Sequence, residues 1–222
     1  MTHSESTNRD NPPPADSRQE NIASSKQRLN NLVAGSFGTH RGLVRMLLGE
    51  AEYLAGRVNP FLQPDLTATR RLVFVCLGNI NRSAFAEGVA ASCGLAAASI
   101  GLSSSTGNPA FHMAIATARH FGIDLGAHRA TDFTDYEYRP GDLLLAMEIR
   151  HAHRLVSQGI PQQAIALLGH WATPHRIHLH DPHTLSSAYF RTCFSLIHSA
   201  VRELAIDCRS AASPAVSPGI SS

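Results

Sequence analysis

The sequence predicts an α/β fold in which a four-stranded parallel sheet forms the middle of three layers and helices cover both of its faces. Two observations predict this fold. Four short apolar runs alternate along the chain with segments whose apolar residues recur at helical spacing, and strands that alternate with helices form a parallel sheet covered on both faces. In addition, 43% of the 222 residues are hydrophobic, which supplies the core of one ordinary domain.

The first strand and the first helix of this sheet frame a short loop. Residues 71–76 form a continuous apolar run, residues 83–93 place Phe85 and Val89 on one helical face, and a glycine-containing loop joins the two. The later elements are a strand at 98–103, a helix at 110–121, a strand at 142–147, a helix at 148–158, a strand at 164–168, and a long amphipathic helix marked by Phe190, Phe194, Ile197, Val201 and Leu204.

Extra helices are predicted before this domain, which spans residues 70–208. In the helical extension and linker at 27–69, apolar residues recur at three- and four-residue steps on both sides of residues 35–38, which predicts two short amphipathic helices. Their apolar faces need a partner, either the domain itself or a docked protein such as a second copy of the chain. The ends, 1–26 and 209–222, are predicted to be disordered because their composition buries too little apolar surface to offset chain entropy.

Composition excludes several classes of function. The formal net charge of +2 includes no basic run, so no nucleic-acid partner is predicted. The absence of an apolar leader and of a stretch of about eighteen apolar residues predicts a cytoplasmic protein without a membrane partner. His178 and His180 invite a metal interpretation, but no cysteine or acidic ligands accompany them at a recognisable spacing, and neither a metal nor another cofactor is predicted. The four cysteines form no CxxC pair, which indicates reduced thiols.

The loop at residues 76–83, with the sequence CLGNINRS, lies where a strand hands over to a helix. In such sheets ligands bind at the carboxyl ends of the strands. Successive main-chain N–H groups and the positive end of the helix form a cradle for a tetrahedral dianion such as phosphate. The predicted phosphate-binding residues are Leu77, Gly78, Asn79, Ile80, Asn81, Arg82 and Ser83.

Three side chains give this cradle chemistry. The positive field favours the thiolate of Cys76, which makes it a nucleophile. Arg82 can hold two phosphoryl oxygens with its planar guanidinium, and the Ser83 hydroxyl can donate to the sulfur. Gly78 is expected to supply a backbone angle that a Cβ forbids, and Asn79 to bond the loop backbone. The alternative is a cysteine that only fills space at a strand end, since C-x5-R also occurs by chance.

The stretch VCLGNINRS resembles the V-C-x-G-N-I-C-R-S signature of the low-molecular-weight protein tyrosine phosphatases. Further elements of that family follow in its order over residues 71–206. They are Ser103-Ser104, Gly107-Asn108-Pro109, Gly122-Ile123-Asp124 with His128-Arg129-Ala130, the stretch DLLLAME at 142–148, and His180-Asp181-Pro182.

The resemblance implies a mechanism and roles for particular residues. Cys76 attacks phosphorus to form a phosphocysteine, while Asp181 protonates the leaving oxygen and later acts as base toward water. Ser104 and His128 brace Asn79 and thereby the loop. For Asp181 the alternative is an aspartate that only forms a turn before a proline.

The substrate implied is a phosphorylated protein, with phosphotyrosine as the family's substrate, or a small phosphomonoester. The family's D-P-Y is Asp181-Pro182-His183 here, so an aromatic wall is missing unless Phe111, His112 or His183 replaces it. Two other functions remain open. One is a phosphate-binding module without turnover; the other is a thioredoxin-coupled arsenate reductase, which needs two further cysteines close to Cys76.

Overall fold

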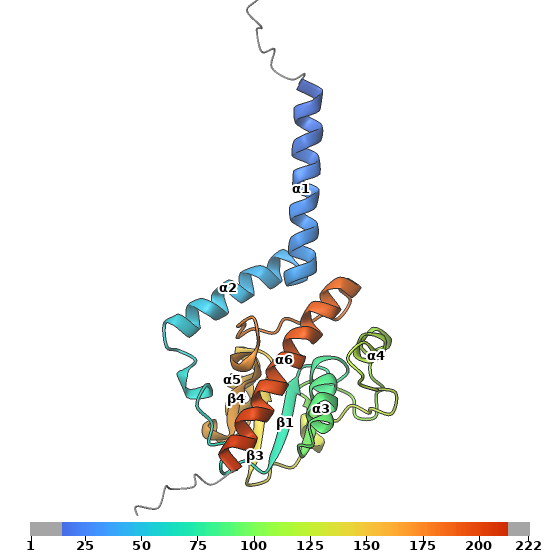
Figure 1. The fold of residues 1–222 in the computed structure, drawn as a ribbon. Helices are drawn as coiled ribbons and strands as arrows, with labels where there is room; N and C mark the ends of the chain where they lie inside the picture. The colour runs from blue at the N-terminus through green and yellow to red at the C-terminus, as the bar shows by residue number, and fades with distance from the viewer. Residues whose placement is uncertain (1–14, 213–222) are drawn as a thin grey trace, which may run out of the picture.

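The computed structural model describes residues 15–212. Figure 1 shows its elements in chain order. The strands are β1 (Arg71–Cys76), β2 (Ala97–Gly101), β3 (Asp142–Ala146) and β4 (Ile165–Leu167). The α-helices are α1 (Ala15–Phe37), α2 (His40–Leu54), α3 (Arg82–Ser92), α4 (His112–Arg119), α5 (Ile149–Ser157) and α6 (Ser187–Ala212). Short 3₁₀ helices lie at Asn59–Phe61, Phe133–Asp135, Gln162–Ala164 and Leu168–Trp171.

The four strands form one parallel sheet in the order β2-β1-β3-β4, which confirms the predicted fold class. Successive residues of β1 point to opposite faces of the sheet. Phe74 lies in a core that includes residues of α3, α4 and α6, whereas Val73 and Val75 lie in a second core with residues of α5. The sheet is therefore the middle of three layers, and α6 crosses one face of it (Figure 1).

The element boundaries differ slightly from the predicted ones, for a local reason. The helix predicted at 110–121 begins at His112 because Phe111 keeps an extended backbone. The helix predicted from residue 148 begins at Ile149 because Glu148 is extended, with φ −145° and ψ 150°. Phe111 and Glu148 thus each come directly before a helix.

The predicted disorder of the two ends is wrong where the structure describes them. Residues 15–26 form the first turns of α1, because the Ala, Arg, Gln, Glu and Lys residues in this stretch favour helix. At the other end, α6 continues to Ala212. The remainder of both predicted tails lies outside the described residues.

The N-terminal extension leaves part of its apolar surface exposed. In Figure 1, α1 projects from the body of the molecule and α2 lies across that body. Leu32 at 66% and Leu54 at 83% are exposed, whereas Val33 is buried and Leu43 and Met46 are half-buried. The apolar faces that were expected to need a partner are therefore covered only in part by the described residues. No helix between residues 15 and 212 combines the length and the apolar character that a membrane span requires.

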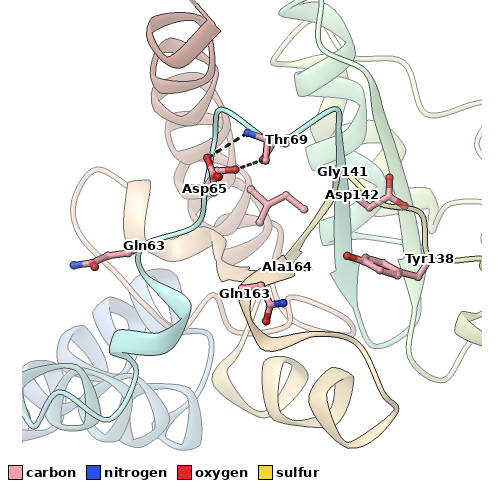
Figure 2. A pocket seen from close by; sticks show the side chains of 10 residues that line it. Gln63, Asp65, Thr69, Tyr138, Gly141, Asp142, Gln163 and Ala164 are labelled. Carbon is pink, nitrogen blue, oxygen red and sulfur yellow. Dashed lines mark hydrogen bonds between the residues drawn. The ribbon is translucent and has the colours of Figure 1, made fainter.

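A cavity of about 310 Å³ lies at the amino ends of the strands, far along the sheet from the predicted phosphate loop. Figure 2 shows Asp65 and Thr69 from the linker on one side of it, and Tyr138 and Asp142 on the other. The Asp142 carboxylate is already bonded to the Arg71 guanidinium at 2.8 and 2.6 Å. Because parallel sheets bind ligands at the opposite edge, this cavity is not a candidate for the predicted chemistry.

Candidate active site

The loop after β1 lies at the point where the strand order reverses, because β1 has β2 on one side and β3 on the other. The carbonyl oxygens of this loop accept hydrogen bonds from the surrounding protein. Leu102 N donates to Cys76 O, Ser103 N to Leu77 O, and Phe111 N to Ile80 O, at 2.9, 2.8 and 3.0 Å. With the carbonyls engaged outside, the N–H groups of the loop are the polar groups available to an anion at its centre.

Cys76 lies at the start of this loop and is buried. Its Sγ is 3.0 Å from Ser83 Oγ and accepts a hydrogen bond from Asn79 N at 3.2 Å. Ser83 Oγ in turn accepts from Asn79 Nδ2 at 2.8 Å, and its own hydroxyl hydrogen can go to the sulfur at 3.0 Å or to Ile100 O at the longer distance of 3.5 Å. The main-chain N–H of Asn79 and the hydroxyl of Ser83 thus both lie against the sulfur.

Asn79 supplies the unusual backbone angle of the loop, with a φ of +52°. The expectation that Gly78 supplies this angle is wrong: Gly78 is not among the residues with positive φ, and a Cβ there would make only an ordinary contact 3.7 Å from Ile80. Asparagine tolerates the left-handed region when its short side chain bonds nearby groups. Here Asn79 Oδ1 accepts from Thr131 N at 2.8 Å, and Nδ2 also donates to Ser99 Oγ at 2.7 Å.

The two predicted bracing residues contact different parts of the loop. The His128 ring nitrogen Nε2 lies 2.7 Å from Asn79 O. Ser104 Oγ donates to Gly78 O at 2.9 Å and so contacts Gly78 and not Asn79. The sequence analysis missed Ser99, because a serine within a strand carries no signal for a contact with a loop twenty residues earlier.

Arg82 is fully buried, and among the described residues its guanidinium donates hydrogen bonds only through Nη1. Its Nη1 donates to Glu148 Oε1 at 2.6 Å and to Leu179 O at 2.8 Å. Its Nη2 lies 2.8 Å from Asp181 Oδ2 as an ion pair without hydrogen-bond geometry. The Nε and Nη2 edge can therefore bind two oxygens of a tetrahedral anion once the Asp181 carboxylate moves away from Nη2.

Burial by itself lowers the pKa of Arg82, but the carboxylates of Asp181 and Glu148 outweigh burial and raise it above the ordinary value. The guanidinium therefore remains charged. Because this positive charge is buried at the end of the loop, it favours an anion bound there.

A cavity of about 200 Å³ opens between the loop and the segment that carries Asp181. Its lining consists of Cys76, Leu77, Gly78, Ile80, Asn81, Ser103, Asp181 and His183. The ring of His183, which lines the cavity, lies 4.8 Å from that of Phe111, edge to face, and the His112 ring is tilted against Phe111 at 4.2 Å. Of the three residues considered as replacements for the missing aromatic wall, His183 lines the cavity, and Phe111 packs against it.

The family model described as low molecular weight phosphotyrosine protein phosphatase matches residues 71–213, the part of the chain that contains the loop, the braces and Asp181. The chain belongs to this family. The family consists of cysteine-based phosphatases, so the prediction of an enzyme of this class is confirmed.

Individual relatives show moderate sequence identity, and the matched region covers nearly the whole length of each relative. The low molecular weight protein-tyrosine-phosphatase Wzb of Escherichia coli strain K12 is 31% identical over 137 residues, which cover 60% of this chain and 92% of the relative. Vibrio vulnificus Wzb in complex with benzylphosphonate has a TM-score of 0.54 and 26% identity, covering 62% and 98% of the two chains. The T. tengcongensis low molecular weight protein tyrosine phosphatase has a TM-score of 0.57 and 26% identity, covering 63% and 99%.

Behind the loop, this phosphatase holds a buried carboxylate that the sequence analysis did not identify as a site residue. Glu148 is fully buried, bonded to Arg82, and its Oε2 is 2.6 Å from Arg150 Nε. Burial raises the pKa of Glu148, but the charge of Arg82 outweighs burial and lowers it below the ordinary range. Its position in the sequence could have indicated this role, because Glu148 is an acidic residue that follows a buried strand at the carboxyl edge of the sheet.

His151 and His178 lie beside the Glu148 carboxylate, and their burial leads us to expect that acid destabilises the fold. Burial lowers the pKa of His151 to about 3 and that of His178 to about 4. In the unfolded chain both titrate near 6.5, so the unfolded state binds more protons as the pH falls from 6.5 to 4. The free energy of unfolding is therefore expected to fall over this window, by on the order of 3 kcal/mol for each histidine, in urea unfolding measured at several pH values.

The control for this prediction is His120→Gln, because His120 is exposed on the surface. His151→Gln and His178→Gln should each flatten the dependence of unfolding free energy on pH between 4.5 and 6.5, whereas His120→Gln should leave it unchanged. An unaltered slope in both core variants would contradict the assignment.

Proposed function

We propose that this protein hydrolyses phosphomonoesters, with protein phosphotyrosine as the substrate, through a phosphocysteine formed on Cys76. The observation that carries the proposal is that Cys76 and Asp181 line one small cavity, and that the Asp181 carboxylate lies 2.8 Å from Nη2 of the buried Arg82, whose Nε and Nη2 have no hydrogen-bond partner among the described residues. A nucleophile, an oxyanion-binding group and a proton donor around one space are what phosphoryl transfer requires.

In the first step, Cys76 Sγ attacks phosphorus in line with the ester oxygen. The S–P bond forms, the P–O bond to the alcohol breaks, and Asp181 gives its proton to the leaving oxygen. The phosphoryl oxygens lie against the loop N–H groups and the Nε and Nη2 edge of Arg82, where they take the position that the Asp181 carboxylate partly occupies in the free protein. This displacement leaves Asp181 free to face the leaving group.

In the second step, water attacks the phosphocysteine while the Asp181 carboxylate takes a proton from it. The S–P bond breaks and inorganic phosphate leaves. The sulfur departs as a thiolate, which the Ser83 hydroxyl and the Asn79 N–H stabilise again at 3.0 and 3.2 Å. One carboxyl group therefore serves as acid in the first step and as base in the second.

The preference for phosphotyrosine is supported by the relatives. Wzb of Escherichia coli is named a protein-tyrosine-phosphatase, and Vibrio vulnificus Wzb is described in complex with benzylphosphonate, whose aromatic ring is joined to phosphorus through one methylene group. In this chain His183 lines the cavity and packs edge to face against Phe111, which offers an aromatic surface for such a ring.

Asp181→Asn is expected to accumulate the phosphoenzyme when p-nitrophenyl phosphate is the substrate. This leaving group departs without an acid, so Cys76 is still phosphorylated, whereas the attack of water loses its base and slows by about 10²- to 10⁴-fold. After rapid acid quenching, mass analysis of peptides should find one phosphoryl group on the peptide that contains Cys76, at much higher occupancy than in the wild type.

Asp124→Asn is the matched control, since Asp124 lies on an exposed loop and accepts a bond only from the neighbouring Gly126 N among the described residues. It should turn over like the wild type. Phosphate found on another residue would disprove the role of Cys76. A wild type that binds inorganic phosphate but hydrolyses neither p-nitrophenyl phosphate nor a phosphotyrosine peptide would indicate a binding module.

The arsenate reductase alternative is opposed by where the other thiols lie. Cys93 is the C-cap of α3, and Cys193 and Cys208 are on α6; none of them lines the cavity at Cys76. Burial also raises the pKa of Cys193 to about 12, which keeps it a thiol. Arsenate turnover coupled to thioredoxin would restore this alternative.

A further inference from the structure

The segment 175–180, which leads into Asp181, lies between α2 and the sheet. On its inner side Leu179 N donates to Met147 O at 3.0 Å, and Leu179 O accepts the bond from Arg82 already described. Ile177 and Leu179 are buried in the two cores of the domain. Alternate residues of an extended segment point to opposite sides, so His178 and His180 face outward, toward the extension.

Helix α2 approaches these histidines through glycines. Gly42 and Gly49 are seven residues apart, which places them on one face of the helix, and both are buried. A Cβ at Gly42 would collide with the backbone oxygen of Phe37 at the end of α1 and would lie 2.8 Å from His180 Cδ2, and a Cβ at Gly49 would lie 3.3 Å from His178 Cβ. Glycine destabilises a helix interior relative to alanine, so the close approach that it allows is the physical reason to have it at these two positions.

The extension also bonds the main chain of this segment directly. Glu50, next to Gly49 on α2, accepts a hydrogen bond from Ile177 N at 3.2 Å, and its other oxygen lies 3.5 Å from His175 Nδ1. At the end of α1, Ser36 O accepts from Arg176 Nη1 at 2.8 Å. Three consecutive residues of the segment are thus held by the two N-terminal helices.

We propose that the N-terminal helices hold the acid-bearing segment in its working position, and that Glu50 is the positioning residue for Asp181. The inference rests on the proposed function, in which Asp181 is the proton donor. Glu50 acts through the main chain of Ile177, four residues before Asp181, and touches neither substrate nor Cys76. The extension lies outside the matched residues 71–213, and the T. tengcongensis relative is covered over 99% of its length without it.

The extension should affect proton donation by Asp181 more than attack by Cys76. Most of the bonds that shape the loop around Cys76 come from residues 83–131, which include Ser99, His128 and Thr131. The region around Asp181 adds the bond from Arg82 to Leu179 O and a 3.4 Å contact between Asn81 and His183. The bonds from the extension go to residues 175–177. Removal of the Glu50 side chain is therefore expected to displace Asp181 while the loop around Cys76 keeps its shape. Hydrolysis should then slow only for substrates whose leaving group needs a proton.

The test compares kcat/KM for phenyl phosphate, whose leaving group needs an acid, with that for p-nitrophenyl phosphate, whose leaving group does not. In the full chain, Glu50→Ala is expected to lower the value for phenyl phosphate about tenfold and that for p-nitrophenyl phosphate by less than about twofold. Inhibition by inorganic phosphate should be unchanged. Glu50→Gln should retain wild-type values for both substrates, because its amide oxygen still accepts the bond from Ile177 N.

Two further variants complete the test: one is a matched control, and the other tests the same contact at a second position. Glu52→Ala, two residues along the same helix, should leave both values unchanged. Gly49→Ala should show the same selective loss for phenyl phosphate through its contact with His178, and it decides the question if Glu50→Ala does not fold. Equal losses for both substrates, or no loss for either, would overturn the inference.

Asp181→Asn, measured in the same series, separates this inference from the proposed function. A selective loss for phenyl phosphate in Asp181→Asn, with none in Glu50→Ala and Gly49→Ala, would overturn the role of the extension and leave the role of Asp181 intact. No selective loss in Asp181→Asn would overturn both. In the double variant of Glu50→Ala and Asp181→Asn, the selective loss should be no larger than in Asp181→Asn alone, because the two act on one proton transfer.

Discussion

Cys76→Ser is expected to lower kcat/KM for p-nitrophenyl phosphate by about 10⁴-fold or more, the largest effect of any single substitution in this protein. A serine hydroxyl at neutral pH is a far weaker nucleophile than a thiolate, and the donors around Cys76 stabilise a negative sulfur. The change is nearly isosteric, so the buried loop should keep its shape. Steady-state hydrolysis with purified protein measures the effect.

Binding distinguishes a lost nucleophile from a damaged cradle. The variant should still be stabilised against heat by inorganic phosphate, because Arg82 and the loop N–H groups remain. Cys93→Ser is the matched control, because Cys93 is a half-buried thiol at the end of α3. Its activity should stay within about twofold of the wild type. Substantial hydrolysis by Cys76→Ser would contradict the phosphocysteine mechanism.

Arg82→Lys is expected to lower kcat by about 10³- to 10⁴-fold, the second largest effect. An ammonium group is a point charge and cannot present the paired Nε and Nη2 edge, which is free of hydrogen bonds among the described residues. It also cannot bind Glu148, Leu179 O and two phosphoryl oxygens at once. The loss should appear in kcat, because the charge on those oxygens changes during the transfer.

Two controls separate this catalytic loss from instability. Arg71→Lys changes another guanidinium that pairs with a carboxylate, Asp142, at the opposite end of the sheet. Its activity should be close to that of the wild type. The double variant of Arg82→Lys and Glu148→Gln removes the buried charge that lysine pairs poorly, and it should unfold at a higher temperature than Arg82→Lys without regaining activity. Activity that returns with stability would contradict the assignment.

The parts of the site that are contiguous in sequence were predictable from it. Cys76, Arg82 and Ser83 lie in one strand-loop-helix unit, and the chemistry of a phosphate cradle follows from their order. The alternation of strands and helices likewise predicted the parallel sheet. Asp181, more than ninety residues from the loop, was found only through the resemblance to a family, because a single aspartate before a proline is a common turn.

The bracing contacts needed the tertiary structure. Ser99 and Thr131 bond Asn79 across 20 and 52 residues, and Glu148 bonds Arg82 across 66. A serine, a threonine and a glutamate are ordinary residues in a sequence, and nothing in their spacing tells which loop they will meet. Similarly, the positive φ was expected at Gly78 but is held at Asn79, because side-chain hydrogen bonds from distant elements stabilise it there.

The sequence alone determined the fold class and the loop that carries the proposed nucleophile and arginine, because strand alternation and a phosphate cradle are local patterns. Tertiary structure alone decided how the N-terminal helices meet the domain. Periodicity marked a set of apolar residues in these helices as the packing face, and Leu32, Leu47 and Leu54 of that set stay exposed. The contact with the segment before Asp181 is made instead by Gly42, Gly49 and Glu50. A hydrophobic pattern reports side chains that avoid water, whereas this contact depends on the close approach of a helix backbone and on one bond to a main-chain amide.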